Sequence, residues 1–140
     1  MSRAKIRTGI PAHVPAVLEL WRQAGAVPTR TDNQQAIEHL LAHDPNSLLV
    51  AEKDSELVGT LIATYDGWRG VLFRLVVLPG ERRRGIASAL VSEGERRLRE
   101  RGAIRVNLYA IRTEAGALDF WTASDYERDE RTCRFVKDIA

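Results

Sequence analysis

The chain has 140 residues, of which 44% are hydrophobic, enough for the core of one domain. Its 21 Lys and Arg residues against 19 Asp and Glu residues leave a net charge of +2, which argues against nucleic-acid binding through bulk charge. There is no membrane-length apolar stretch and no signal-peptide core, and the single cysteine fits a reducing compartment, so we expect a cytoplasmic protein that does not bind membranes.

Hydrophobic spacing predicts two helices and three strands in the first half of the chain. Apolar residues at Val14, Val17, Leu18 and Trp21 follow helical spacing after Pro11, a residue type favoured at the start of a helix. In chain order we expect a strand over Lys5–Thr8, a helix from Pro11 to Gly25 and a loop over Ala26–Asn33. A second helix then carries Ile37, Leu40 and Leu41; Asp32 or Asn33 can cap its start, and Asp44-Pro45-Asn46 ends it. Strands over Leu48–Glu52 and Leu57–Tyr65 follow.

In the second half, a hairpin turn over 66–70 leads to an apolar strand over 72–78, which ends at Pro79. A helix follows as far as Gly102, since Ile86, Leu90, Val91 and Leu98 recur at helical spacing. We then expect a strand over Ile104–Ile111, a helix over Ala115–Thr122 and one or two closing strands between Tyr126 and Val136. The order β-α-α-β-β-β-α-β-α-β predicts an α/β protein with a mixed sheet.

The most informative segment is the turn between the apolar strand and the next helix, residues 79–88. Amides at a helix N-terminus lack intrahelical partners and the helix dipole is positive there, so this turn favours an anion, a phosphate above all. Gly85 has no Cβ, which lets a phosphate oxygen approach the main chain, and Arg82, Arg83 and Arg84 add positive charge. The turn therefore suits a diphosphate ligand. The alternative is a basic surface turn that caps an ordinary helix.

The spacing Arg82-x-x-Gly85-x-Ala87, preceded by Val77-Leu78-Pro79, resembles the Arg/Gln-x-x-Gly-x-Gly/Ala pattern of the GNAT superfamily, the acyl-CoA-dependent N-acetyltransferases. The order of predicted elements is also similar to that of the family, and the resemblance covers Ile6 to Ile139. The chain resembles small single-domain bacterial members, including those similar to ribosomal-protein N-terminal acetyltransferases. This implies one GNAT-like domain over residues 1–140, an α+β fold with a mostly antiparallel central sheet flanked by helices.

The resemblance also implies acetyl-CoA as cosubstrate, with no metal, and direct transfer of the acetyl group to an amine. In the family, the strand before the turn exposes backbone groups that bind the pantetheine arm, and amides of the turn bind the pyrophosphate. Carried over, the pantetheine strand is Leu75, Val76 and Val77, the pyrophosphate amides are those of Arg83, Arg84, Gly85, Ile86, Ala87 and Ser88, and Arg82 adds charge. Trp121 then packs beside the thiol end and shapes the acyl pocket.

The chain departs from the family at the residues that carry the chemistry. The family's acid is a Tyr in an Asn-x-x-Ala-x-x-x-Tyr pattern, but here Glu114 replaces the Asn and Trp121 replaces the Tyr, and an indole supplies no titratable proton. Tyr109 matches the position of a Glu base in ribosomal-type enzymes and is the best remaining candidate for an acid or water-positioning group, ahead of Tyr65 and Tyr126. The alternatives are a half-buried strand aromatic in each case, and catalysis by positioning alone, with solvent supplying protons.

We therefore predict an N-acetyltransferase that acts on a primary amine of a small molecule or a protein N-terminus. Its acceptor site is expected to be lined by Trp21, the loop Ala26–Asp32, Trp68 and the loop near Asp129–Thr132. One alternative is a catalytically degenerate CoA-binding regulator or sensor, favoured by the missing Tyr and Asn. Another is a nucleic-acid-binding domain, which would need aromatic residues among the arginines of 82–101, where the sequence has none. A homodimer is left open.

Three smaller features have simpler interpretations. His39 and His43 lie four residues apart on a predicted helix, a spacing that can bind a metal, but no Glu or Cys completes the set and we expect solvated residues. The alternating charges of 93–101 are typical of a solvated helix face. Cys133 lies in a strand-like segment, so we expect it to have a packing role.

Overall fold

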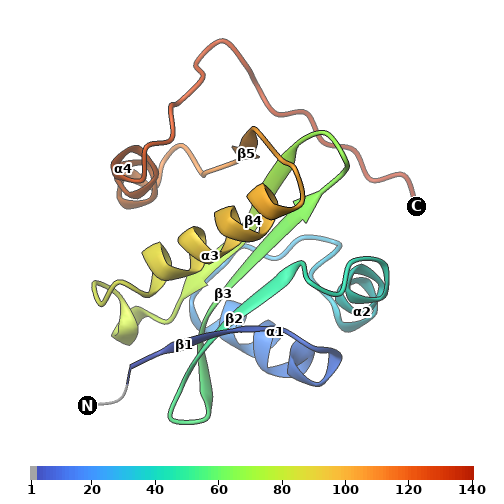
Figure 1. Ribbon diagram of the computed structural model, residues 1–140, viewed down its shortest axis with the longest axis vertical. Helices are drawn as coiled ribbons and strands as arrows, with labels where there is room; N and C mark the ends of the chain where they lie inside the picture. Colours follow the sequence, from blue (N-terminus) through green and yellow to red (C-terminus); the bar gives the residue numbers. More distant parts are fainter. Residues whose placement is uncertain (1–2) are drawn as a thin grey trace. The chain divides into compact units, whose positions relative to one another are not determined.

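The strands form one sheet in the order β1-β2-β3-β4-β5, in a computed structural model that describes residues 3–140 (Figure 1). The pairings from β1 to β4 are antiparallel, and the predicted fold class is confirmed. Contacts divide the chain after Asn107 into two compact units. The elements are β1 (Lys5–Thr8), α1 (Val14–Gln23), α2 (Gln34–His43), β2 (Leu48–Lys53), β3 (Glu56–Tyr65), β4 (Gly70–Val77), α3 (Ile86–Glu100), β5 (Val106–Leu108) and α4 (Ala115–Ala123), with 3₁₀ turns over Pro11–His13 and Pro79–Glu81.

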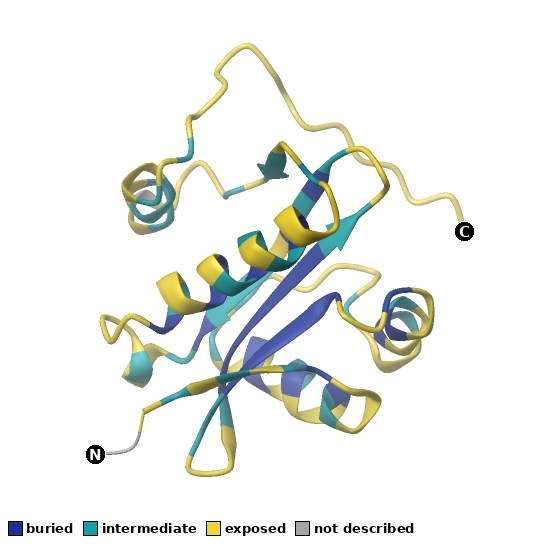
Figure 2. Ribbon diagram, in the orientation of Figure 1, coloured by how far each residue is buried: buried dark blue, intermediate teal, exposed yellow. Residues whose placement is uncertain are grey.

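Helices cover both faces of the sheet in the first unit (Figure 1). Alternate residues of a strand point to opposite faces. Ile62 of β3 belongs to the core that α1 and α2 form, whereas its neighbours Leu61 and Ala63 lie against Gly94 of α3. The middle strands β2 and β3 are therefore buried on two sides (Figure 2). The core on the α1–α2 side consists of Val14, Val17, Leu20, Trp21, Ile37, Leu41, Leu48, Val50 and Ile62.

Helix α3 approaches the sheet closely because glycines lie at the contact. A Cβ at Gly94 would come within 2.9 Å of Leu61 Cδ2, and a Cβ at Gly70 of β4 would come within 2.8 Å of Leu98 Cδ1. At such distances the leucine side chain would have to shift before a methyl group could fit. The two glycines fix the height of α3 above β3 and β4, and with it the position of the turn from which α3 starts.

The loop between α1 and α2 ends at Asn33, one of the two predicted caps. Its Oδ1 accepts a hydrogen bond from the amide of Ala36 at 2.9 Å, which satisfies one of the free amides at the start of α2. Asp32, the other candidate, does not cap the helix. Its carboxylate binds Arg74 of β4 instead.

Three predictions about the C-terminal part are wrong. Strand β5 covers only Val106–Leu108 rather than Ile104–Ile111, and Ile104 is 98% exposed. No strand forms among the described residues after Ala123, although one was expected between Tyr126 and Val136, and Cys133 is exposed rather than packed. Around residue 129, side chains bind the backbone locally, as in the bond from the Arg131 amide to Asp129 Oδ1 at 3.0 Å. Such local bonds compete with strand pairing.

Candidate functional site

The turn that joins β4 to α3 has the backbone conformation of an anion site. After the 3₁₀ turn, Arg83 and Gly85 both adopt left-handed conformations, with φ of 64° and 79°. Gly85 caps α3 without a side-chain hydrogen bond, and its carbonyl accepts from the amide of Ala89 at 3.0 Å. The amides of residues 86–88 therefore lack partners within the helix and point toward the turn. Such amides, at the positive end of the helix dipole, suit a phosphate.

Gly85 owes its place to conformation and not to packing. A Cβ at this position would find no protein atom within 4 Å, so the space beside the main chain is open to a ligand. The left-handed φ is costly for other residues but not for glycine. The other residues predicted to offer amides lie on either side of Gly85: Arg83 and Arg84 precede it in the turn, and Ile86, Ala87 and Ser88 begin α3.

The three arginines of the turn differ in their contacts. Arg82 Nε donates to the carbonyl of Val77 at 3.2 Å, so this side chain holds the turn to the end of β4. Arg84 lies 3.5 Å from Glu81, and Glu81 also pairs with Lys53 at 3.1 Å. Arg83 is exposed. The three arginines therefore do not contribute equally to the positive charge expected at the start of α3, because Arg82 donates to a backbone carbonyl and Arg84 already has a carboxylate neighbour.

Strand β4 is bulged just before the turn. Thr60 pairs with Val76 and Ile62 pairs with Phe73, so a single β3 residue lies opposite two β4 residues, Arg74 and Leu75. A bulge leaves backbone groups outside the ladder and re-aims the strand. Of the predicted pantetheine residues, Leu75 lies in the bulge, and Val76 and Val77 follow it. Leu75 and Val76 are half-buried and Val77 is buried.

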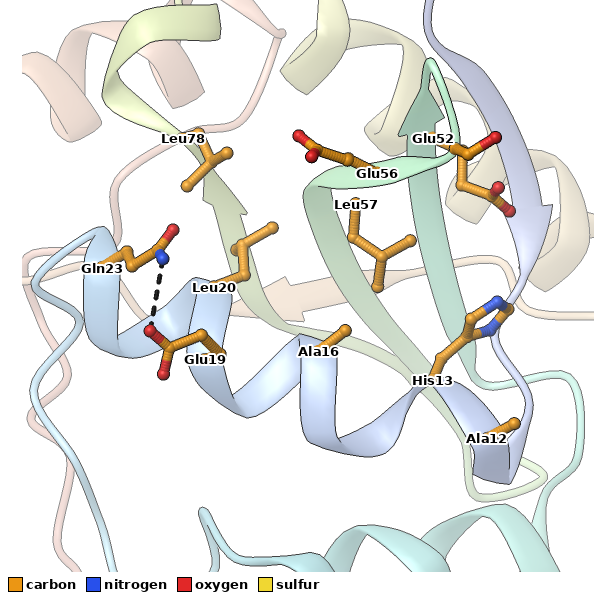
Figure 3. A pocket seen from close by; sticks show the side chains of 11 residues that line it. Ala12, His13, Ala16, Glu19, Leu20, Gln23, Glu52, Glu56, Leu57 and Leu78 are labelled. Atoms are coloured by element: carbon orange, nitrogen blue, oxygen red, sulfur yellow. Dashed lines mark hydrogen bonds between the residues drawn. The ribbon is translucent and has the colours of Figure 1, made fainter.

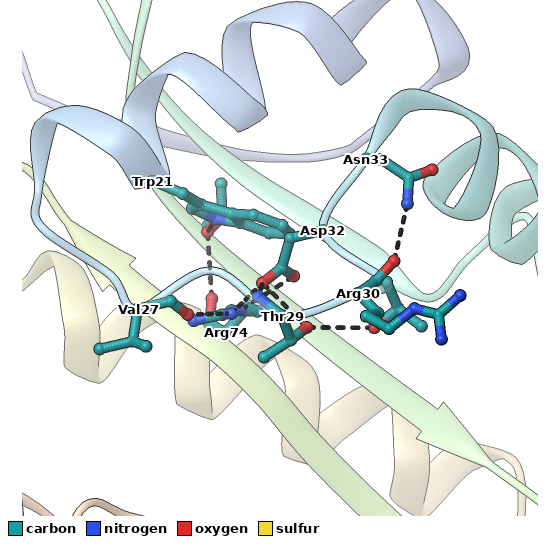
Figure 4. A network of polar contacts seen from close by, with 9 residues as sticks. Trp21, Val27, Thr29, Arg30, Asp32, Asn33 and Arg74 are labelled. Atoms are coloured by element: carbon teal, nitrogen blue, oxygen red, sulfur yellow. Dashed lines mark hydrogen bonds and ion pairs between the residues drawn. The ribbon is translucent and has the colours of Figure 1, made fainter. Parts of the chain in front are cut away.

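A polar network fastens the α1–α2 loop to this bulge (Figure 4). Arg74 Nε donates to Asp32 Oδ1 at 3.2 Å, and Arg74 Nη2 binds Asp32 Oδ2 and also donates to the carbonyl of Val27 at 2.7 Å. The carbonyl of Arg74 accepts from Thr60 Oγ1 at 3.0 Å, and this hydroxyl accepts from the indole of Trp21 at 2.8 Å. The network joins α1, the loop, β3 and β4.

Sequence reasoning missed this network and misplaced one of its members. Trp21 is only 4% exposed, so it lies in the core and does not line an acceptor surface as expected. Trp21 shares the helical spacing of the apolar residues of α1, and this spacing could have predicted its position in the core. The position of Arg74 as a single charged residue inside the apolar sequence of β4 could have predicted an ion pair, because a charge at such a position needs a partner.

Tyr109, the first candidate for the chemistry, and Trp121, the expected wall of the acyl pocket, both belong to the second unit, whereas Tyr65 ends β3 in the first. Tyr109 is 59% exposed, and the guanidinium of Arg134 lies 5.1 Å from the centre of its ring. Trp121 is half-buried in α4 and packs edge-on against Phe120 and Tyr126, with ring centres 5.0 Å and 5.1 Å away. Trp68, another expected acceptor residue, is exposed in the β3–β4 turn.

A groove of about 450 Å³ lies along α1 and the β2–β3 hairpin (Figure 3). Its rim carries carboxylates that the sequence analysis did not single out. Glu19 accepts from Gln23 at 3.2 Å and from Arg22 Nε at 2.9 Å, and Glu52 pairs with Arg7 at 3.3 Å. Glu19 and Glu52 therefore already have cationic or amide partners, and Glu56 is the third carboxylate of the lining.

The remaining sequence features have surface roles. Glu93 and Arg96 pair on α3 at 2.7 Å, in keeping with a solvated helix face. Within residues 3–140, no three His, Cys, Asp or Glu side chains gather so that they could hold a metal ion, and His39 and His43 lie on α2. In the same part of the chain, no helix combines the length and the apolar character that crossing a membrane requires.

Comparisons with known proteins agree with this geometry. The model of the acetyltransferase (GNAT) family matches residues 14–126. An acetyltransferase of Pectobacterium atrosepticum is 37% identical over 112 residues, which cover 80% of this chain and 79% of that protein. An acetyltransferase of Sodalis glossinidius is 36% identical over 114 residues, covering 81% and 80%. The chain therefore belongs to the acetyltransferase (GNAT) family, and it is an acyltransferase.

Solved structures show the same fold. Aminoglycoside N-acetyltransferase AAC(6')-Iy, in complex with a CoA-linked bisubstrate analogue, aligns with a TM-score of 0.79 and 20% identity over 99% of this chain and 100% of that one. Ard1 from Thermoplasma volcanium aligns with a TM-score of 0.78 and 21% identity, covering 86% and 80%.

Proposed function

We propose that the protein transfers the acetyl group of acetyl-CoA to a primary amine of a small molecule or of a protein N-terminus. The observation that carries this proposal is the N-terminus of α3, which has no side-chain cap and is reached through the left-handed residues Arg83 and Gly85. A pyrophosphate accepts hydrogen bonds from such amides and is stabilised by the helix dipole. Structures of the same fold contain CoA or a CoA-linked analogue, which supports the same ligand here.

In this proposal, the amides of residues 83–88 bind the pyrophosphate, and the backbone of Leu75, Val76 and Val77 binds the pantetheine arm. Strand β4 has eight residues and β5 has three, so β5 cannot pair with the whole of β4. Strand amides and carbonyls without a neighbouring strand are free to bind an extended ligand. Arg82 then acts through the turn, since it holds the end of β4.

The proposed reaction is direct attack on the thioester. The neutral amine nitrogen bonds to the carbonyl carbon, the bond from that carbon to sulfur breaks, the thiolate of CoA leaves, and the nitrogen loses a proton. We assign Tyr109 as the donor to the sulfur or as the residue that positions a water, because its exposed phenol can exchange protons with solvent. We assign Trp121 to the wall of the acyl pocket.

The second candidate is a CoA-binding regulator or sensor without useful turnover. Glu114 and Trp121 at the family's Asn and Tyr positions favour it. We also propose that both units act together as one cytoplasmic acetyltransferase domain, since the family match spans residues on both sides of Asn107 and the single cysteine suits a reducing compartment.

Titration calorimetry with CoA and acetyl-CoA tests the binding site. Gly85→Glu should abolish binding, because its carboxylate would occupy the open space and repel phosphate. Gly67→Glu is the matched control: Gly67 is also left-handed, with φ of 93° and open space around it, but it lies in the β3–β4 turn. If Gly85→Glu stays folded and binds CoA as well as the parent, the proposal is wrong.

Turnover separates the two candidates. Release of free thiol is followed with purified protein, acetyl-CoA and a panel of small amines and peptides with free N-termini. Release that depends on the amine supports the acetyltransferase. Tight acetyl-CoA binding with no release across the panel favours the regulator or sensor.

A further inference from the structure

Arg74 holds an unusual backbone conformation in the middle of β4. Its φ is 51°, in the left-handed region that residues other than glycine avoid. Such a conformation persists only where surrounding contacts maintain it. The side chains of Arg74 and Asp32 are 21% and 10% exposed, so the ion pair between them is largely shielded from water. The Asp32–Arg74 ion pair is therefore a candidate for the contact that maintains the left-handed conformation of Arg74 in the bulge.

The carboxylate of Asp32 serves the loop and the strand at the same time. It accepts from the amide of Thr29 at 2.7 Å and from its hydroxyl at 3.0 Å, which closes a turn within the α1–α2 loop. It also accepts hydrogen bonds from Nε and Nη2 of Arg74. A third contact, from Arg74 to the carbonyl of Val27, reaches the start of the same loop. One guanidinium thus fastens both ends of the segment 27–32.

The main chain of Arg74 is held from the other side. Thr60 donates to its carbonyl at 3.0 Å, and the ring of Trp21 lies 5.3 Å from the guanidinium, within the range of a cation–π contact. The loop cannot move away from the strand unless the Asp32–Arg74 pair breaks. If that pair breaks, the bulge also loses contacts that maintain its conformation.

We infer that Asp32 and Arg74 are positioning residues that couple the α1–α2 loop to the bulge of β4, so that acyl-CoA bound along β4 stabilises the loop. The inference rests on the proposed function, because it takes β4 as the strand that binds acyl-CoA. Coupling of this kind is reciprocal. An acceptor amine that holds the loop in place therefore also stabilises the bulge conformation, to which acyl-CoA binds.

Hydrogen exchange of the whole chain, with and without saturating acetyl-CoA, tests the coupling. In the parent, we expect ligand binding to slow exchange directly at residues 83–90. We also expect exchange at residues 27–33 to become about 3- to 10-fold slower, because the net free energy of roughly one hydrogen bond changes an equilibrium constant by that factor. In Asp32→Asn and Arg74→Gly, protection of 83–90 should persist while ligand-dependent protection of 27–33 is lost. Arg74→Gly removes only the side chain, because glycine adopts the left-handed φ freely.

Asp44→Asn is the matched control. The Asp44 carboxylate is also shielded, with 11% of its side chain exposed, and pairs with Arg101 at 3.0 Å, away from the bulge. This variant should keep both protections. Equal protection of 27–33 in the parent and in both test variants would overturn the inference, as would a parent that protects 83–90 but not 27–33. A parent that protects neither segment would overturn the proposed function, and the inference with it.

Discussion

The indole nitrogen of Trp21 donates to Thr60 Oγ1 at 2.8 Å, and the same hydroxyl donates onward to the carbonyl of Arg74 at 3.0 Å. Thr60 is fully buried, so its bond to Trp21 is shielded from water, and its bond to Arg74 is partly buried. A single hydroxyl thereby satisfies a donor from α1 and an acceptor at the bulge. Among the described residues, no buried side-chain nitrogen or oxygen lacks a partner.

Thr60→Ala should lower the free energy of unfolding by about 1–3 kcal/mol, because it leaves the Trp21 indole and the Arg74 carbonyl unsatisfied in the core. Urea unfolding followed by circular dichroism measures the change. Thr122→Ala is the control: Thr122 is exposed and bonds only to its own helix, so a change within about 0.5 kcal/mol is expected. A Thr60→Ala protein as stable as the parent would show that water replaces the lost partner.

Gly94→Ala should destabilise the protein although alanine favours helices. The added Cβ would lie 2.9 Å from Leu61, and overpacking of about 1–3 kcal/mol exceeds the roughly 1 kcal/mol gained in helix propensity. Gly116→Ala in α4 is the matched comparison, since no atom lies within 4 Å of its added Cβ. That variant should be neutral or more stable in thermal unfolding. Equal shifts for the two variants would contradict close packing of α3 on β3.

Glu93 gives a pH dependence with a defined sign. Its pKa is lowered from 4.5 to about 2, chiefly because Arg96 donates to the carboxylate, with a second bond from Arg97, while burial opposes the shift. A group with a lowered folded-state pKa adds stability that is complete above its unfolded pKa and is lost as the pH falls through the folded value. The stability from Glu93 is therefore present above pH 4.5 and lost toward pH 2.

Glu93→Gln should accordingly reduce the free energy of unfolding near neutral pH by up to about 1 kcal/mol, and the difference from the parent should shrink as the pH falls toward 2. Urea unfolding at a series of pH values measures this. The control is Glu100→Gln, because the Glu100 side chain is 65% exposed and, among the described residues, it bonds to Arg96. A difference between Glu93→Gln and the parent that stays constant with pH would be evidence against the shift.

Local signals allowed most of the fold to be predicted. The Asn33 cap depends on neighbouring residues only, and the structure has it. The predicted strand over Lys5–Thr8 also forms, because β2 supplies its antiparallel partner. The segment after Tyr126 has strand-like spacing, but a strand also needs a partner, which spacing does not supply. Asp32 fits a helix cap as well as Asn33 does. Its actual partner, Arg74, is 42 residues away in the sequence.

The same distinction applies to the candidate site. The glycine turn before α3 is a local feature, and its open amides follow from a helix start at Ile86. The roles of the arginines are not local, because Arg82 is directed by the carbonyl of Val77, and Arg84 lies near Glu81, which Lys53 also contacts. The resemblance to the family indicated the backbone site, but it could not predict which side chains remain for the phosphates.

The resemblance to the family places Trp121 at the position of a proton-donating Tyr, and the Trp121 ring packs against Phe120 and Tyr126. We expect Trp121→Tyr to change thiol release little, because a free thiol has a pKa of about 8.5 and its thiolate leaves readily near neutral pH. The rate is measured at saturating acetyl-CoA with an accepted amine. Tyr109→Phe should slow release only if Tyr109 is the donor. A silent parent beside a Trp121→Tyr variant that gains about 10²-fold would favour the degenerate binder over the enzyme.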